Sequence, residues 1–397
     1  MTATYSNYDV VIVGGGIYGC SIAWWLTQMA DFNGRVLVIE RDPTYETAAT
    51  SLTNSCIRQQ FTNETNVRIS QFGAEFINNF RHFMGNDPDV PDLSIQSYGY
   101  LYLADTQAFA DDLKAAQYIQ AGLGAATKHM TRDEIRSDYP FFQLDDIYGA
   151  NHNLVNEGYF DGGTVFDWFK RMARKNGVEF IAAEAARLIR EGRRVTQVEL
   201  KDGTRISCGV VVNAAGTRAR KLAQTAGLDI PVEPRRRYTY IFDAAEPLDR
   251  DLPLTIDPSG VHFRTDGRYY LAGGRPDEDP EVDVDDFAAD HSLWEDKFWP
   301  IIATRIPQFE RIKLVNMWVG HYDYNTLDQN AILGPHPEAE NLIFANGFSG
   351  HGLQQAPALG RGLAEWITFG SYQTLDLAPF SVERVLSGEK FLEKAVI

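Results

Sequence analysis

Residues 8–19 read YDVVIVGGGIYG, and this stretch decides the fold of the N-terminal part of the chain. The run 8–13 is rich in β-branched residues, which is typical of a strand buried on both faces. Directly after the glycines, residues 20–30 (CSIAWWLTQMA) carry apolar side chains at helical spacing, and a second buried run, residues 35–39 (RVLVI), ends at Glu40. The order of strand, glycines, helix, strand and acid predicts a βαβ unit that binds a dinucleotide.

The glycines and the start of the helix have separate physical roles in such a unit. Gly14 allows the tight turn out of the strand, Gly16 lets the backbone approach a pyrophosphate, and Gly19 lets the helix pack closely on the strand. The helix begins at Ile17 and Tyr18, where free N–H groups and a partial positive charge face the phosphates.

Glu40 stands at the end of the second strand, where a carboxylate can reach the nucleotide ribose, and the next residue, Arg41, is a further cofactor-binding candidate. A carboxylate there accepts hydrogen bonds from ribose hydroxyls and repels a 2′-phosphate, so NADP is not expected.

A second nucleotide-type segment spans residues 195–216. Two strand-like runs, VTQVEL at 195–200 and ISCGVVV at 206–212, flank the Asp-Gly pair of a predicted hairpin. The second run leads into Ala215 and Gly216, a small-residue turn that either closes against a nucleotide or allows close packing.

The C-terminal residues 341–367 read NLIFANGFSGHGLQQAPALGRGLAEWI and are more specific. A buried strand runs into the glycine-rich turn 347–352, and a helix is expected to begin near Gln354, because Pro357 is tolerated in the first turn of a helix. A helix N-terminus reached through glycines is an electrophilic surface.

The C-terminal stretch, together with VVIVGGGIYG and SCIRQQF at 55–61, resembles the D-amino-acid-oxidase superfamily, and within it the sarcosine oxidase and dimethylglycine dehydrogenase branch. The resemblance runs from residue 9 to near residue 367 and implies FAD as the dinucleotide. It implies an α/β fold in which a doubly wound, Rossmann-like FAD domain is interrupted by an antiparallel β-sheet substrate domain with flanking helices. We assign 1–85, 150–232 and 325–397 to the FAD domain, and 86–149 and 233–324 to the substrate domain.

The resemblance also implies which further residues surround the flavin. Ser55 and Cys56 belong to a stretch that lines the flavin in relatives. The glycine-rich turn and the helix start supply the others, which are Gly347, Ser349, Gly350, His351, Gly352, Leu353 and Gln354.

Arg58 is the predicted anchor of the substrate, since the matching arginine in relatives pairs with a substrate carboxylate; a structural ion pair or a contact with FAD phosphate is the alternative. Sarcosine oxidase has a lysine as second carboxylate partner where this chain has Gln354. Its oxygen-activating lysine is also missing, because no lysine occurs between Lys221 and Lys297. Arg268 or Arg275 could substitute, or the electron acceptor is not O₂.

Strand alternation supplies further pocket candidates, because residues two apart lie on one face. These candidates are His262, Arg264, Tyr240, Tyr322 and Tyr324, and a half-buried sheet face is the rival interpretation of each. A second arginine at Arg264 would suit a substrate with two carboxylates.

A non-covalent FAD is predicted. Tyr322 replaces the cysteine to which sarcosine oxidase attaches its flavin, and no histidine occurs between Met1 and Arg81, the region of the dimethylglycine dehydrogenase attachment site.

Composition bounds the remaining possibilities. A chain of 397 residues favours two domains, and a formal charge of −17 disfavours nucleic acid and membrane surfaces as partners. Three scattered cysteines form no metal-ligand cluster, so no metal is expected, and they suit a reducing compartment. With no apolar run of bilayer length and no leader-like N-terminus, we expect a cytoplasmic protein, whose oligomeric state the sequence leaves open.

The sequence therefore predicts an FAD-dependent oxidase or dehydrogenase that acts on the CH–NH group of a small amine or amino acid, with O₂ or another electron acceptor. N-substituted glycines such as sarcosine, dimethylglycine or iminodiacetate are the favoured substrates, and a primary D-amino acid or glycine is an alternative within this class. A different class of function is a flavoprotein assembly factor or scaffold, in which turnover is incidental.

Overall fold

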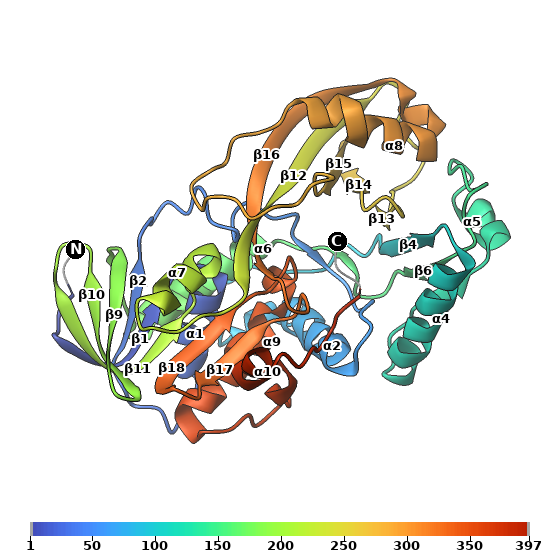
Figure 1. The fold of residues 1–397 in the computed structure, drawn as a ribbon. Coiled ribbons are helices and arrows are strands. Elements are labelled where there is room, and N and C mark those ends of the chain that lie inside the picture. Colours follow the sequence, from blue (N-terminus) through green and yellow to red (C-terminus); the bar gives the residue numbers. More distant parts are fainter. Residues whose placement is uncertain (1–2, 395–397) are drawn as a thin grey trace.

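Two eight-stranded sheets carry the fold in the computed structural model, which describes residues 3–394 (Figure 1). A short two-stranded sheet pairs β3 (Cys56–Ile57) with β7 (Gly158–Tyr159). Along the chain, each of these two strands lies where the chain passes from one large sheet to the other. The first large sheet is built from the nucleotide-type segments, and the second from most of the intervening sequence.

The first sheet has the order β17-β18-β11-β1-β2-β8, and β10 and β9 extend it from β11 as an antiparallel pair. The strands from β18 to β8 are parallel, and β17 is antiparallel to β18. The bounds are β1 (Asn7–Val13), β2 (Val36–Glu40), β8 (Glu179–Ala182), β9 (Ala185–Glu191), β10 (Arg194–Leu200), β11 (Arg205–Asn213), β17 (Ile332–His336) and β18 (Ala339–Asn346).

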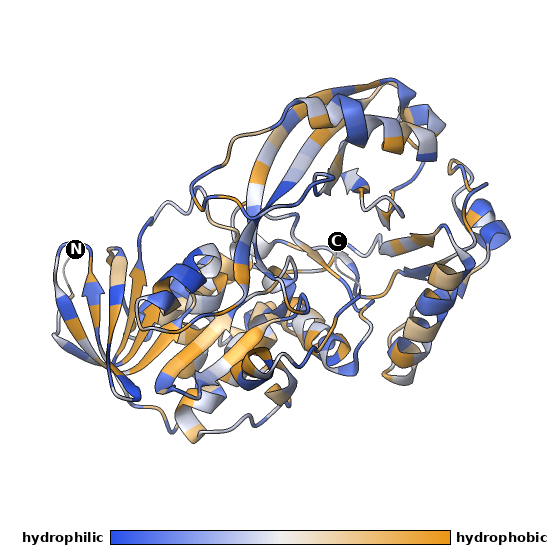
Figure 2. Ribbon diagram, in the orientation of Figure 1, coloured by the Kyte–Doolittle hydropathy of each residue, from blue (hydrophilic) through white to orange (hydrophobic). Residues whose placement is uncertain are grey.

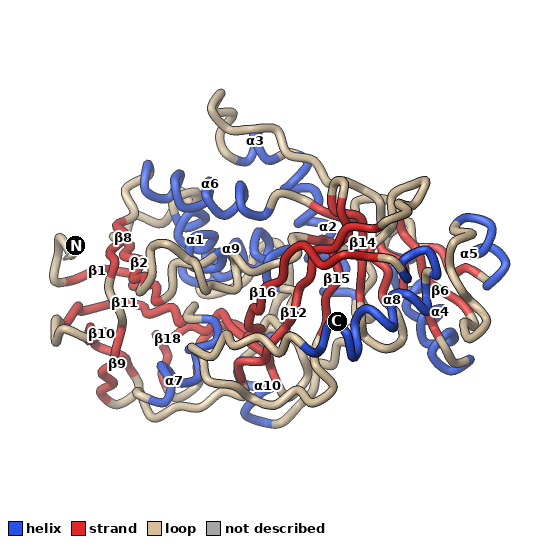
Figure 3. Tube along the Cα trace, turned by 90° about the horizontal axis from the view of Figure 1, so that it is seen from above, coloured by secondary structure: helices blue, strands red, loops and turns tan. Residues whose placement is uncertain are grey.

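Two apolar clusters cover opposite faces of this sheet, whose strands appear as a hydrophobic block in Figure 2. One face packs against helices α1 (Ile17–Leu26), α2 (Glu64–Asn78), α6 (Gly162–Lys175) and α9 (Gly352–Phe369), and the other against α7 (Ala219–Gln224). All ten residues of α1 are buried, because the helix lies between the sheet and α6 and α9 (Figure 3). This arrangement confirms the predicted doubly wound domain.

The second sheet has the order β16-β12-β15-β14-β13-β4-β6-β5 and is antiparallel except between β13 and β4. The bounds are β4 (Tyr100–Ala104), β5 (Lys128–Met130), β6 (Gly149–Asn153), β12 (Val232–Ala244), β13 (Leu254–Ile256), β14 (His262–Asp266), β15 (Tyr269–Gly274) and β16 (Ile312–Asn325). β6 crosses the expected boundary at residues 149 and 150, so residues 150–153 pair within the second sheet.

Helices flank the second sheet, as predicted. A π-helical turn (Trp294–Phe298) and α8 (Trp299–Arg305) cover the apolar face of β12 and β15, and α4 (Gln107–Gly122) and α5 (Arg132–Asp138) lie beside β6 (Figure 1). The remaining helices are α3 (Phe80–Phe83), α10 (Val382–Ser387) and the 3₁₀ turns Gly216–Arg218, Pro307–Glu310 and Ala378–Phe380.

Two helices differ in their bounds from the prediction. The apolar spacing of residues 66–84 predicts one amphipathic helix, but the segment is divided at Asn79, whose backbone leaves the helical region, into α2 and α3. α9 begins at Gly352 rather than near Gln354, so Pro357 lies in its second turn. Among residues 3–394, no helix combines the length and the apolar character needed to cross a membrane.

Candidate functional site

A cavity of about 610 Å³ joins the two sheets, which is within the usual range for a small-molecule site. The first sheet contributes the loops after β1, β2 and β11 together with the glycine-rich turn before α9. The segment before α2 and strands of the second sheet, among them β12, β14 and β16, also contribute to the wall. Segments from the whole length of the chain therefore meet at one site.

The turn after β1 forms one end of the cavity. Gly14 has a φ of +103°, and a Cβ there would lie 2.2 Å from the carbonyl oxygen of Ala214, in the turn after β11. A Cβ on Gly19 would lie 1.9 Å from the oxygen of Gly14, so Gly19 permits close packing of α1 on β1 and does not line the cavity. Gly14 and Gly19 thus meet the steric conditions that the dinucleotide motif predicts.

Glu40 faces the cavity and also braces the glycine turn. Its Oε2 accepts a hydrogen bond of 2.8 Å from the backbone N–H of Gly15, and its Oε1 accepts one of 2.8 Å from Asp42. Arg41 next to it forms an ion pair of 3.7 Å with Asp285. The carboxylate therefore couples the end of β2 to the turn after β1.

The glycine-rich turn before α9 is held from β16. One carboxylate oxygen of Asp323 accepts hydrogen bonds from the N–H groups of Gly347 (2.8 Å) and Phe348 (3.3 Å). Burial raises the pKa of Asp323 to about 7, against the lowering effect of these hydrogen bonds. A Cβ on Gly350 would lie 2.4 Å from the ring of Tyr322, so β16 and the turn are in close contact.

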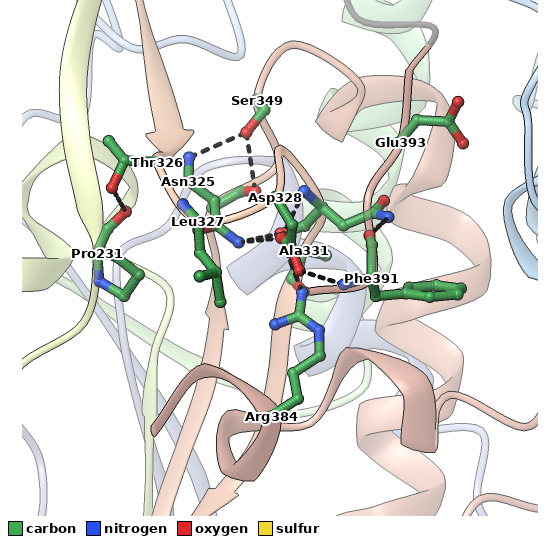
Figure 4. Close-up of polar contacts among 12 residues, drawn as sticks. Pro231, Asn325, Thr326, Leu327, Asp328, Ala331, Ser349, Arg384, Phe391 and Glu393 are labelled. Atoms are coloured by element: carbon green, nitrogen blue, oxygen red, sulfur yellow. Dashed lines mark hydrogen bonds and ion pairs between the residues drawn. The ribbon is translucent and has the colours of Figure 1, made fainter. Parts of the chain in front are cut away.

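A buried polar network supports the other side of this turn (Figure 4). The N–H of Asn325 donates to Ser349 Oγ (3.0 Å), and the side-chain amide of Asn325 donates to Asp328 (2.8 Å). Asp328 is fully buried, and it also accepts from Arg384 (3.3 Å) and from the N–H of Phe391 (2.9 Å). The chain after α10 therefore contributes to the support of the glycine-rich turn.

Arg58 lies in the cavity wall opposite the start of α9. Its backbone N–H donates to Oε1 of Gln354 (2.9 Å), and its guanidinium lies 4.4 Å from the centre of the Phe61 ring. The rings of Tyr100 and Tyr102 are 5.8 and 5.9 Å away. The arginine is 3% exposed, so its charge lies in a desolvated, aromatic setting.

Glu157, which the sequence does not single out, holds the segment around Arg58. Its carboxylate accepts from the N–H of Gln59 (2.7 Å) and from the side-chain amides of Gln60 (2.9 Å) and Asn153 (2.8 Å). Burial raises the pKa of Glu157 to about 7. No spacing motif marks this residue, because the contacts join segments far apart in the chain.

His262 lines the cavity through a short polar chain. Its Nε2 lies 3.0 Å from the side-chain nitrogen of Asn54, and the hydroxyl of Thr239 donates to the oxygen of Asn54 (3.2 Å). Burial, with the positive charge of Arg264 next in effect, lowers the pKa of His262 to about 3, so the imidazole is neutral.

Three of the predicted pocket residues lie outside the cavity wall. Arg264 pairs with Asp266 (2.7 Å) and donates to the carbonyl oxygen of Asn54 (3.2 Å). Tyr240 packs in the core of the second sheet against Trp294. The ring of Tyr324 has its centre 5.7 Å from the guanidinium of Arg237. Of the five predicted pocket residues, His262 and Tyr322 line the cavity.

Strand alternation explains why Tyr240 is in the core. In β12 the aromatic rings of Tyr238 and Tyr240 face the apolar cluster, so the alternate residues Arg237 and Thr239 face the cavity. Assigning the apolar face of β12 to the core would have identified both polar residues from the sequence.

Most of the predicted cofactor residues line the cavity, whereas Gly19 and Gly347 support the turns behind it. Those in the wall are Gly14, Gly16, Ile17, Tyr18, Glu40, Arg41, Ser55, Cys56, Ala215, Gly216, Ser349, Gly350, His351, Gly352, Leu353 and Gln354. The close approach at Gly14 and the continuous cavity from β2 to Arg58 fit an extended dinucleotide such as FAD.

Comparison with known proteins supports the interpretation of this cavity as an FAD site. The profile described as FAD dependent oxidoreductase matches residues 9–366. A Xenopus laevis FAD-dependent oxidoreductase domain-containing protein 1 is 38% identical, over 98% of this chain and 85% of that protein. Mouse mitochondrial sarcosine dehydrogenase is 23% identical over 96% of this chain but 41% of its own length.

Among solved structures, L-proline dehydrogenase from P. horikoshii superposes with a TM-score of 0.84 and 26% identity, covering 97% of this chain and 99% of that one. The predicted resemblance to the D-amino-acid-oxidase superfamily of flavoproteins is therefore confirmed at the level of family and fold.

Proposed function

The chain belongs to the D-amino-acid-oxidase family of FAD-dependent oxidoreductases, and on this premise we propose that it oxidises the C–N bond of small secondary or tertiary amino acids such as sarcosine. Bound FAD supplies the acceptor for the hydride that leaves the carbon next to nitrogen. The protein residues bind the amino acid, orient it and keep water away from the reacting carbon. Water then hydrolyses the imine product.

The observation that carries the proposal is the placement of Arg58. Its guanidinium is buried in the wall of the cavity, and its backbone is tied to Gln354 at the start of α9. A guanidinium holds a carboxylate through two parallel hydrogen bonds, which fixes both the position and the orientation of a small amino acid. A substrate carboxylate there would meet a cation that is largely shielded from water, where a charge-assisted hydrogen bond is strong.

The neighbours of Arg58 favour a substrate with one carboxylate. Gln354 is neutral, and its Oε1 already accepts from the Arg58 backbone. His262 is neutral because of burial, so it adds no positive charge to the pocket. The remaining lining near Arg58 includes the ring of Tyr100 and the side chain of Leu254, which suit a small N-alkyl group.

Arg58→Lys tests the proposal. The variant keeps the charge and loses the two-pronged geometry, so the rate of flavin reduction by sarcosine should fall by about ten- to a thousandfold. FAD content, measured from the visible absorbance of the purified protein, should stay near that of the wild type. Both O₂ consumption and dye reduction should be followed, because the proposed acceptor is O₂ or another oxidant.

A different result would reassign Arg58. If Arg58→Lys loses FAD while the remaining holoprotein is reduced at the wild-type rate, Arg58 is a cofactor ligand. The substrate anchor would then lie elsewhere in the cavity wall.

A further inference from the structure

Two arginines, Arg58 and Arg237, line the same cavity from different parts of the fold. Arg58 precedes α2, and Arg237 lies on β12 with its guanidinium 4.7 Å from the centre of the Tyr322 ring. Burial raises the pKa of Tyr322, and the charges of Arg237 and Arg58 both act against that rise. The two guanidinium groups are therefore within electrostatic reach of one side chain in the cavity wall.

The guanidinium of Arg237 is already matched by an internal carboxylate. Its Nη1 lies 2.8 Å from Oδ1 of Asp279 and its Nη2 lies 3.0 Å from Oδ2, which is a two-pronged pair. The two side chains are 9% and 12% exposed, so the pair is largely shielded from water. Arg237 therefore lines the cavity with a guanidinium that already binds a carboxylate, that of Asp279, through two hydrogen bonds.

Asp279 belongs to a segment that is fastened to the rest of the molecule at several points. We call residues 277–286 the acidic strap; it follows β15 and crosses to the first sheet. Its other ion pairs include Asp277 with Lys297 (2.6 Å), Asp283 with Lys221 (3.7 Å), Asp285 with Arg218, and Asp286 with Arg236. Because the strap is held on both sides of Asp279, this carboxylate is positioned without contribution from any ligand.

Arg264 is not placed to bind a second substrate carboxylate. It pairs with Asp266 and donates to the Asn54 carbonyl, and it lies outside the cavity wall. If Arg58 binds one carboxylate of a substrate, a second carboxylate would therefore approach Arg237, which is already paired with Asp279.

We propose that the Arg237–Asp279 pair determines substrate specificity, with the Asp279 carboxylate occupying an anion position that a second substrate carboxylate would otherwise take. This inference rests on the proposed function, since it assumes that Arg58 binds the first carboxylate. The pair excludes dicarboxylates in two ways: the guanidinium is already neutralised, and the Asp279 charge repels an incoming anion. The natural substrates are accordingly amino acids with one carboxylate and an uncharged N-substituent.

The test compares two non-oxidisable anions, acetate and malonate, on the FAD-loaded protein. Affinities are measured by calorimetry, and the flavin absorption spectrum reports binding at the site. The wild type should bind acetate more tightly than malonate. Asp279→Asn should raise the affinity for malonate relative to acetate by about tenfold or more, because Arg237 regains an unmatched charge.

Asp277→Asn is the matched control, since it removes the same charge from the same strap at the pair with Lys297 and should leave the malonate-to-acetate ratio at the wild-type value. Adding Arg237→Gln to Asp279→Asn should abolish the gain. An equal gain in Asp277→Asn would mean that net charge, and not this pair, sets the preference, and would overturn the inference.

The inference and the proposed function can fail separately. If acetate binds but Asp279→Asn leaves the ratio unchanged, the inference is wrong and the proposed function stands. Wild-type protein that prefers malonate also overturns the inference, without any variant. If the wild type binds neither anion and sarcosine does not reduce the flavin, the inference and the proposed function are both wrong.

Discussion

Arg58 and Gln354 are 296 positions apart in the chain, and one hydrogen bond between them joins the segment before α2 to the start of α9. The bond uses the backbone N–H of Arg58, so it fixes the backbone of a residue that lines the cavity. On the other side Glu157 holds Gln59 and Gln60. The position of the proposed carboxylate anchor is therefore set by its neighbours and not by its own rotamer alone.

Asp323 leads to a prediction about pH. Its pKa is raised in the folded protein to about 7, from about 3.9 in an unfolded chain, so its contribution to stability is fully present at low pH and is lost as pH rises to about 7. Relative to wild type, Asp323→Asn should therefore gain stability as pH rises from about 4 to about 7, with no further change above that. Urea unfolding with saturating FAD measures the difference.

Asp249→Asn serves as the control for this experiment, because Asp249 is an exposed carboxylate paired with Arg250. It should give no trend between pH 5 and 8. A pH-independent difference between wild type and Asp323→Asn would contradict the assigned environment of Asp323.

At the scale of single elements, the glycine-rich turn 347–352 has little steric freedom. Gly350 has a φ of +93°, and a Cβ there would enter the ring of Tyr322. The turn is further fixed by Asp323 and by the Asn325–Ser349 hydrogen bond. A change in its backbone would therefore displace the start of α9.

Gly350→Ala should weaken FAD binding by about tenfold or more, because the methyl group forces the turn and Tyr322 apart. Gly370→Ala is the matched control: Gly370 has a φ of +73°, but nothing lies within 4 Å of its Cβ position. FAD dissociation constants from flavin fluorescence measure both. Equal losses in the two variants would show that backbone strain alone, without the contact to Tyr322, explains the effect.

The existence of these elements could be predicted from local pattern, but their bounds and faces depended on tertiary contacts. The strand runs at β1, β2, β10, β11 and β18 were placed within a few residues by apolar periodicity. α9 starts earlier than Pro357 suggests, and α1 packs against the proline turn: Trp25 donates to the carbonyl oxygen of Pro357 (2.9 Å) and Ser21 to that of Ala356 (2.8 Å). No local signal in the sequence indicates these contacts.

At the scale of the whole molecule, the cavity depends on loops and strands from both sheets, and its lining spans residues 13–354. Motifs identified the nucleotide end because glycines and a terminal acid have fixed steric roles. They did not identify Arg237, Glu157 or Asn54, because the roles of these residues come from partners distant in the chain. A larger share of the residues predicted to bind the cofactor than of those predicted for the substrate pocket therefore lines the cavity.

The mode of FAD attachment is a prediction for the whole protein. Tyr322 replaces the expected cysteine, so acid precipitation should release intact FAD into the supernatant, where absorbance and fluorescence quantify it. Cys56 is the one cysteine in the cavity lining among the described residues, and Cys56→Ala should release the same amount. Flavin that remains in the wild-type pellet and not in that of Cys56→Ala would indicate a covalent bond to Cys56.

The most direct test of the account is anaerobic titration of the purified, FAD-loaded protein with N-alkyl glycines, followed by the visible absorbance of the flavin. We expect sarcosine or another member of this series to bleach the flavin, with one carbonyl product formed by imine hydrolysis for each flavin reduced. Amines of similar size without a carboxylate should reduce it far more slowly, because they cannot pair with Arg58. A flavin that stays oxidised with every N-alkyl glycine, with D-amino acids and with glycine would contradict the proposed activity.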